Sequence, residues 1–95
     1  MFLINMVFND MTKLTDKLTE QHRNYIAKEY LNNNLMFGGR KVPRTGGIIL
    51  SKHQTKQQLI NLLDADPFIN TGVASYTITE FVPVMASEEF ESILS

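Results

Sequence analysis

Near its start the chain carries the run Phe2-Leu3-Ile4-Asn5-Met6-Val7-Phe8. Side chains alternate between the two faces of a strand, so Phe2, Ile4, Met6 and Phe8 share one face while Leu3, Asn5 and Val7 share the other. Apolar residues on both faces are typical of a strand that meets little solvent on either side. We therefore predict a strand over residues 2–8, covered on both faces and ended by Asn9-Asp10.

Three further strands are predicted downstream. Gly47-Ile48-Ile49-Leu50-Ser51 is an unbroken apolar run, which favours a central position in the sheet. Leu35-Met36-Phe37 begins a strand that runs into Gly38-Gly39. Val73 to Val84 predicts a long fourth strand, and Pro83 places its last part at an edge or an end because proline cannot donate to a ladder.

Two helices separate these strands. The first is predicted from about Thr15 to Asn32 or Asn33, with Thr12 and Thr15 as alternative N-caps. Its apolar sector holds Leu14, Leu18, Tyr25 and Ile26. Thr55 is expected to cap a second helix that runs through Asp64. Ser87 is expected to cap a short helix near the C-terminal end.

The element order is therefore βαββαβ followed by a tail, which predicts an α+β protein with the ferredoxin-like arrangement. That arrangement has a four-stranded antiparallel sheet with two helices on one face. We expect a single domain over residues 1–95, with its core at 2–84 and a helical tail at 86–95. The strands carry apolar side chains in both directions, so we predict that a second copy covers the other face and forms a homodimer.

Composition excludes several classes of function. Nine basic and ten acidic residues give a net charge of −1, which offers no overall field for nucleic acid. Cysteine is absent, so disulfides, thiolate metal sites and thiol nucleophiles are excluded. No apolar run approaches the length of about 18 residues that a membrane span needs, and no signal-peptide pattern is present. We expect a cytoplasmic protein with neither nucleic acid nor membrane as a partner.

His22 and Asp66 are the candidates for acid–base chemistry. His22 falls inside the apolar sector of the first predicted helix and so points toward the sheet or a crevice beside it. It is either a half-buried structural histidine or a proton-transfer group, because histidine exchanges protons near neutral pH. Asp66 precedes Pro67 just after the second helix. It is either a turn former or the carboxylate that orients His22.

Substrate-binding candidates lie between these two positions. Gly38-Gly39 either allows a bulge or makes room for a ligand. Arg40, Lys41 and Arg44 form either a solvated loop or a site for a carboxylate or phosphate. The aromatic residues Tyr25, Tyr30, Phe37 and Phe68 either line a pocket or pack in the core.

Neither a metal nor a cofactor is expected. The chain has two histidines, His22 and His53, which fall on different predicted elements without a close-spaced ligand pair. His53, at the junction of the third strand and second helix, is expected to face solvent. The glycine pattern also lacks the spacing of a phosphate-binding loop.

Four segments resemble the YCII-related (YciI-like) proteins, a family of small bacterial domains. They are Gln21-His22-Arg23, the run from Gly38 through Gly47, Asp66-Pro67-Phe68, and the run from Gly72 through Ile78. The resemblance covers residues 2–84 and implies a dimeric α+β barrel with a His22–Asp66 dyad at its active site. Many relatives carry a small hydroxyl residue where this chain has Gly38-Gly39, which is a departure at the substrate side of that site.

The sequence leaves three functions in competition. The first is a cofactor-free lyase or isomerase on a small metabolite, with His22 moving a proton, Asp66 holding the imidazole, and Gly38, Gly39, Arg44 and Phe68 binding substrate. The second is a non-catalytic module for small-ligand binding or dimeric assembly. The third, anion or nucleic-acid sensing by the basic loop, is the weakest because three charges on a net-acidic domain supply little binding energy.

Overall fold

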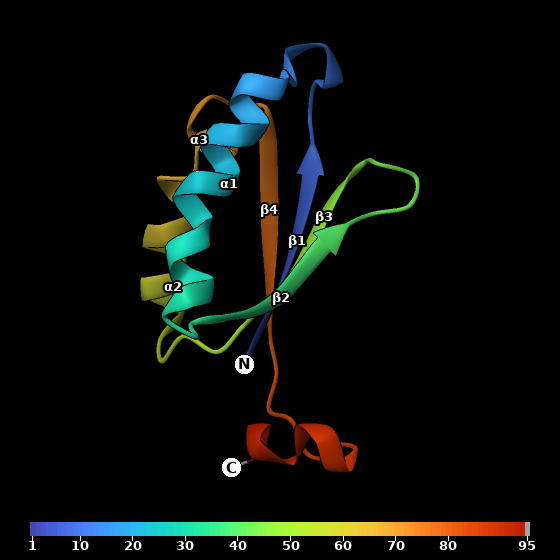
Figure 1. Ribbon diagram of the computed structural model, residues 1–95, viewed down its shortest axis with the longest axis vertical. Helices are drawn as coiled ribbons and strands as arrows, with labels where there is room; N and C mark the ends of the chain where they lie inside the picture. Colours follow the sequence, from blue (N-terminus) through green and yellow to red (C-terminus); the bar gives the residue numbers. More distant parts are fainter. Residues whose placement is uncertain (95) are drawn as a thin grey trace.

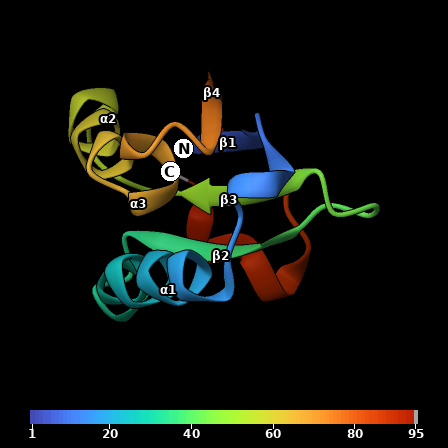
Figure 2. The same ribbon diagram turned by 90° about the horizontal axis from the view of Figure 1, so that it is seen from above.

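The computed structural model describes residues 1–94 and contains one four-stranded antiparallel sheet in the order β2-β3-β1-β4. The strands are β1 (Phe2–Phe8), β2 (Leu35–Arg40), β3 (Gly46–Ser51) and β4 (Ala74–Glu80). The helices are α1 (Asp16–Leu31), α2 (Lys56–Asp64) and α3 (Pro67–Asn70), with 3-10 helices η1 (Met11–Lys13) and η2 (Glu88–Ile93). Figures 1 and 2 show the three α-helices on one face of the sheet, which confirms the predicted ferredoxin-like arrangement.

The helix caps explain where α1 and α2 begin. The side-chain oxygen of Thr15 accepts the N–H of Leu18 at 3.1 Å, and that of Thr55 accepts the N–H of Gln58 at 3.2 Å. Each bond satisfies one of the N–H groups that the first turn of a helix leaves without a partner. The cap of α1 is therefore Thr15, whereas Thr12 lies within η1.

The hydrophobic core lies between the helices and the sheet. One face of β1 and the inner positions of α2 supply its most buried side chains, and Ile4 and Leu59 are each 0% exposed. The ten core residues are Phe2, Ile4, Met6, Ile26, Leu35, Ile49, Leu59, Leu63, Phe68 and Ala74. The alternation predicted for residues 2–8 thus places Phe2, Ile4 and Met6 in the core.

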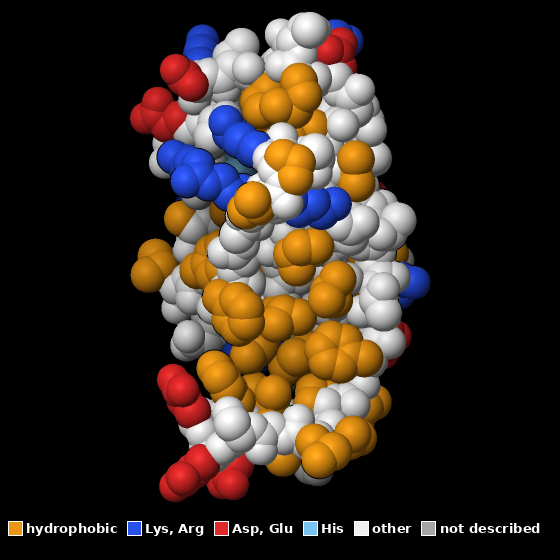
Figure 3. Space-filling model, turned by 90° about the vertical axis from the view of Figure 1, so that its right-hand side faces the viewer, with side chains coloured by type: hydrophobic (Ala, Val, Ile, Leu, Met, Phe, Trp, Pro, Cys, Tyr) orange, Lys and Arg blue, Asp and Glu red, His pale blue; other side chains and the backbone are white. Residues whose placement is uncertain are grey.

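The opposite face of the sheet carries apolar side chains that no helix covers. Val7, Phe37 and Ile48 are 39%, 55% and 37% exposed on this face, which we call the open face. Figure 3 shows an extended apolar patch on this side of the molecule. At one end of the open face, the segment at 81–93, which follows β4, borders an open hollow of about 490 Å³ together with Met36, Phe37 and Leu50.

The fourth strand is shorter than predicted. β4 ends at Glu80, whereas the prediction extended it to Val84. Its partner β1 begins at Phe2, opposite Glu80, and the last main-chain exchange joins Phe81 to Met1. A strand cannot continue as part of a sheet beyond the end of its neighbour. The residues that follow therefore leave the sheet before Pro83.

The C-terminal segment also differs from expectation. It forms the 3-10 helix η2, and the side chain of Ser87 makes no capping hydrogen bond. Phe90 on η2 remains 43% exposed. Among residues 1–94, none of the helices combines the length and apolar character that crossing a membrane requires.

Candidate functional site

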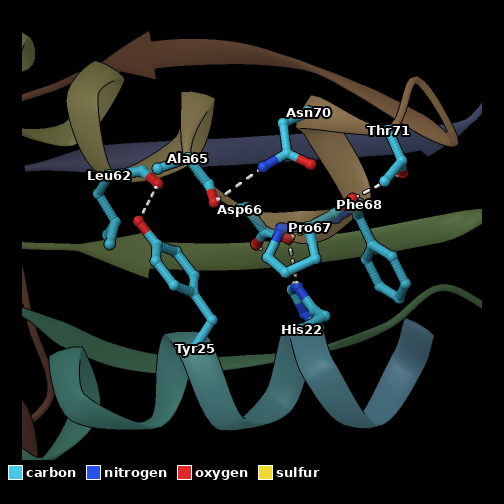
Figure 4. A network of polar contacts seen from close by, with 9 residues as sticks. All are labelled: His22, Tyr25, Leu62, Ala65, Asp66, Pro67, Phe68, Asn70 and Thr71. Atoms are coloured by element: carbon cyan, nitrogen blue, oxygen red, sulfur yellow. Dashed lines mark hydrogen bonds and ion pairs between the residues drawn. The ribbon is translucent and has the colours of Figure 1, made fainter. Parts of the chain in front are cut away.

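His22 and Asp66 lie 44 residues apart in the sequence and touch in the structure (Figure 4). His22 projects from the middle of α1, and Asp66 sits immediately before α3. The Nδ1 atom of His22 lies 2.7 Å from Oδ2 and 2.9 Å from Oδ1 of Asp66. The structure therefore places both sequence candidates for acid–base chemistry in one hydrogen-bonded contact.

Local sequence chemistry holds Asp66 in this place. Its backbone is extended, with φ −65° and ψ 133°, and its Oδ1 atom accepts the N–H of Phe68 at 2.8 Å. Pro67 follows as the first residue of α3, a position where the missing N–H of proline costs nothing. The Asp-Pro pair is thus the N-terminal signal of α3, a short helix that was not predicted from the sequence.

Burial decides which imidazole nitrogen faces outward. The side chain of Asp66 is 1% exposed, and its carboxylate accepts a hydrogen bond from Nδ1 of His22. Nε2 then carries the free lone pair. Within residues 1–94 no buried side-chain nitrogen or oxygen lacks a partner, and no hydrogen bond involves Nε2, so this atom is accessible. A histidine held in this way can accept a proton and return it.

Aromatic packing fixes the plane of the imidazole. The ring of His22 stacks on that of Phe68, with centroids 4.2 Å apart and an interplanar angle of 14°. Phe8 meets Phe68 edge-to-face at 5.5 Å. Phe68 is itself 4% exposed, so the imidazole rests against a surface that belongs to the core. Stacking and the Asp66 bond together leave the ring little freedom to rotate.

His22 opens into a pocket of about 470 Å³ between α1 and the sheet. Four of the other predicted site residues also line this pocket: Gly38, Gly39, Arg44 and Phe68. Asp66 does not line it, because it lies behind the imidazole and within the protein. The volume is in the range of small-molecule sites.

Gly38 leaves space for a neighbouring hydroxyl group. A Cβ atom at this position would lie 2.7 Å from Oη of Tyr30 and 3.0 Å from Cγ1 of Ile49. The bulge in β2 falls earlier, between Leu35 and Phe37, so it does not account for Gly38-Gly39. A side chain at position 38 would therefore compete with the Tyr30 hydroxyl for the same space.

Two tyrosines flank the site. Burial raises the pKa of Tyr30, whose side chain lines the pocket, so its hydroxyl stays protonated at neutral pH and can donate a hydrogen bond there. Burial and then the charge of Asp66 raise the pKa of Tyr25. The Tyr25 hydroxyl already donates a hydrogen bond to the carbonyl of Leu62 at 2.8 Å, and this bond links α1 to α2 (Figure 4).

Sequence reasoning missed two pocket residues on α1. Thr19 and Arg23 line the same pocket as His22, although only the resemblance included Arg23 among its motifs. The signal was the helical spacing, because Thr19 lies three residues before His22 and Arg23 lies four residues after Thr19. Residues with this spacing share one stretch of helix surface.

The expectation that His53 faces solvent is wrong. Its side chain is 6% exposed, with Nδ1 2.6 Å from Oγ of Ser51 and Nε2 3.1 Å from Oε2 of Glu29. The turn from β3 to α2 places this imidazole against the C-terminal part of α1, where Glu29 lies. Ser51 is 0% exposed, and neither His53 nor Glu29 lines the pocket at His22, so this second histidine–carboxylate contact lies apart from that pocket.

Possible metal ligands are few in this arrangement. Across residues 1–94 the structure holds no group of three or more histidine, cysteine, aspartate or glutamate side chains that could bind an ion.

The comparison with protein families matches residues 1–82 to the YCII-related domain. The chain belongs to the YCII-related family. The match includes both His22 and Asp66, together with every residue of the pocket. The comparison with curated proteins returned no match.

A solved structure supports the fold independently of the sequence. The chain is similar to 5-chloro-2-hydroxyhydroquinone dehydrochlorinase from Burkholderia phenoliruptrix, solved in complex with 2,5-dihydroxybenzoquinone, with a TM-score of 0.61. The two chains are 17% identical, and the similarity covers 84% of this chain and 91% of the dehydrochlorinase chain. At this identity the likeness shows a shared fold.

Proposed function

We propose that this YCII-family chain is a cofactor-free lyase or isomerase that acts on a small metabolite through proton transfer by His22. The observation that carries the proposal is the accessible Nε2 of His22, placed at a pocket while Nδ1 is held by the buried carboxylate of Asp66. The fold is also similar to that of a dehydrochlorinase, which is a lyase-type enzyme, and this similarity supports the proposed class of reaction.

The chemistry needs only groups of the chain. Nε2 of His22 would take a proton from a carbon next to a carbonyl, and the electron pair of that C–H bond would move toward the carbonyl oxygen. Asp66 would stabilise the imidazolium that forms. In an isomerase the proton would return to another carbon. In a lyase a leaving group would depart with its bonding electrons, and the proton would be released to solvent.

The first test measures proton abstraction itself. The protein is incubated in deuterated water with a panel of cyclic and open-chain ketones, hydroxyquinones and hydroxyhydroquinones, the last including 5-chloro-2-hydroxyhydroquinone. Deuterium uptake and chloride release are followed. We expect His22→Gln to lower the rate of the reaction that the parent protein catalyses by at least about 100-fold, the usual contribution of a general acid or base. Glutamine retains a donor for the Asp66 carboxylate but cannot exchange a proton.

The matched control is His53→Gln. His53 also contacts a carboxylate, that of Glu29, but lies outside the pocket. This variant should keep the rate within a few-fold of the parent protein. Equal rates for the His22→Gln variant and the parent would contradict the proposal. Saturable ligand binding with no exchange and no turnover would support the non-catalytic binding module instead.

We also propose that two copies pair through the open face. The support is the exposed apolar set of Val7, Phe37 and Ile48 on the side opposite the helices, since exposed patches of this kind are typical of interaction sites. Two sheets packed face to face would cover it.

Ile48→Glu tests this pairing because Ile48 lies on the open face of β3, the second strand of the sheet. Light scattering should give twice the 10.9 kDa of one chain for the parent protein and the single-chain mass for the variant. Burying an unpaired carboxylate in an apolar interface is strongly unfavourable. Gln58→Glu on the exposed side of α2 adds the same charge elsewhere and should remain dimeric. A parent protein with the mass of one chain would overturn the pairing.

A further inference from the structure

All three arginines of the chain line one pocket. Arg23 comes from α1, Arg40 from the end of β2, and Arg44 from the loop that joins β2 to β3. This is the pocket into which His22 opens. Three separate elements thus bring every arginine of a net-acidic chain to the lining of the same pocket.

The positive charge of this pocket is not balanced by protein groups. No aspartate or glutamate lines it, and the ion pairs found within residues 1–94 both involve histidine, not arginine. Asp66 is buried behind His22 and is bonded to it. Figure 3 shows Lys and Arg side chains gathered beside the apolar patch. A concave site lined by one sign of charge concentrates its field on a bound ligand.

The floor of the pocket is flat at the sheet. On its helix-facing side, β2 presents Gly38 and Arg40 opposite Ile49 and Gly47 of β3. Two of these four positions therefore carry no side chain. The stacked rings of His22 and Phe68 form a second flat surface. Such a space favours a planar ligand over a branched one.

We propose that the ligand of this pocket is a small planar acid whose carboxylate is bound by Arg23, Arg40 and Arg44. The inference rests on the proposed function, because it names the substrate class for the same site. Guanidinium groups match carboxylates through two parallel hydrogen bonds. They would also stabilise the negative charge that develops on the substrate when His22 removes a proton.

Carboxylate fits this pocket better than phosphate. Many phosphate sites add the free N–H groups of a helix N-terminus to basic side chains of this kind. Asp66 already accepts the N–H of Phe68 at the start of α3, and Thr15 accepts that of Leu18 at the start of α1. The side chains, and not the main chain, therefore supply the donors here.

A matched pair of ligands tests the proposal by calorimetry, without any need for turnover. The probes are 2,5-dihydroxybenzoate and its neutral amide, 2,5-dihydroxybenzamide, which have nearly the same shape. The acid should bind the parent protein at least tenfold more tightly than the amide in 50 mM salt. Each of Arg23→Gln, Arg40→Gln and Arg44→Gln should weaken binding of the acid by about tenfold or more, while changing that of the amide little.

Lys41→Gln is the control, because Lys41 lies next to Arg40 but does not line the pocket. This variant should bind the acid as the parent does. Equal affinity for acid and amide, or an effect of Lys41→Gln as large as that of Arg40→Gln, would overturn the proposal. Tighter binding of phenyl phosphate than of benzoate would overturn the choice of carboxylate.

Titration and deuterium exchange, both measured on the parent protein, separate this proposal from the proposed function. Binding selectivity for the acid in a protein that shows no deuterium exchange would sustain the anion site and refute the enzyme. Exchange on neutral ketones, with no preference for acids, would do the opposite.

Discussion

Replacing Asp66 by alanine should lower the free energy of unfolding by about 2–4 kcal/mol, as measured by urea denaturation. The variant loses the N-cap of α3, which normally contributes about 1 kcal/mol, and a charge-assisted bond to His22, which contributes about as much again or more. Asp66 is 0% exposed, so water cannot replace either partner without entering the core.

Asp10→Ala is the matched control for this change. Asp10 caps η1 in the same way, accepting the N–H of Thr12 at 3.0 Å, but it has no histidine partner and is solvent-exposed at this bond. Its replacement should shift the denaturation midpoint far less. Asp66→Asn should recover much of the lost stability, because asparagine is also a strong N-cap, while failing to support proton transfer. Equal destabilisation by Asp10→Ala and Asp66→Ala would show that the His22 contact adds nothing to the fold.

Gly46→Ala should lower the free energy of unfolding more than the addition of a methyl group at any other glycine of the sheet. A Cβ atom there would lie 1.9 Å from the carbonyl oxygen of Met6 and 2.8 Å from its carbonyl carbon. Those are main-chain atoms of β1, the strand at the centre of the core, so they cannot rotate away as a side chain would. We expect a loss of at least about 3 kcal/mol, because overpacking without room to relax is among the most costly substitutions.

Gly39→Ala provides the comparison on the neighbouring strand. No atom lies within 4 Å of the position of its Cβ, so its unfolding free energy should stay within about 0.5 kcal/mol of the parent value. The two variants add the same group to adjacent strands, and urea denaturation of both isolates the effect of the contact. A Gly46→Ala variant with the parent midpoint would mean that β3 can shift relative to β1 without loss.

Most of the secondary structure could be predicted because its signals are local. Thr15 and Thr55 precede apolar periodic runs, and both cap the helices that they predict. The unbroken apolar run at 47–51 correctly indicates a central strand, because β3 lies between β2 and β1 in the sheet. The end of β4 could not be predicted in this way, since it depends on where β1 begins.

The contact between His22 and Asp66 lies beyond what spacing can show. The apolar sector of α1 gives the direction of His22, but the position of Asp66 depends on α3, a helix of four residues that pattern reasoning overlooked. The resemblance paired the two residues, and the geometry supplies the reason. His53 shows the converse problem, because a junction residue looks exposed until Glu29 and Ser51 are placed around it.

The carboxylate of Asp66 serves two purposes at once, as helix cap and as partner of the imidazole. A variant of this protein without the proposed proton transfer would still need an acceptor for the N–H of Phe68, so loss of a capping side chain at position 66 would be opposed by folding alone. The side chain of His22 has no comparable role in satisfying a main-chain group, because it bonds the Asp66 carboxylate instead. When homologues are sorted by their fitness for the proposed proton transfer, the residue at position 22 is therefore more informative than the presence of a capping residue at position 66, because aspartate and asparagine both satisfy the fold there.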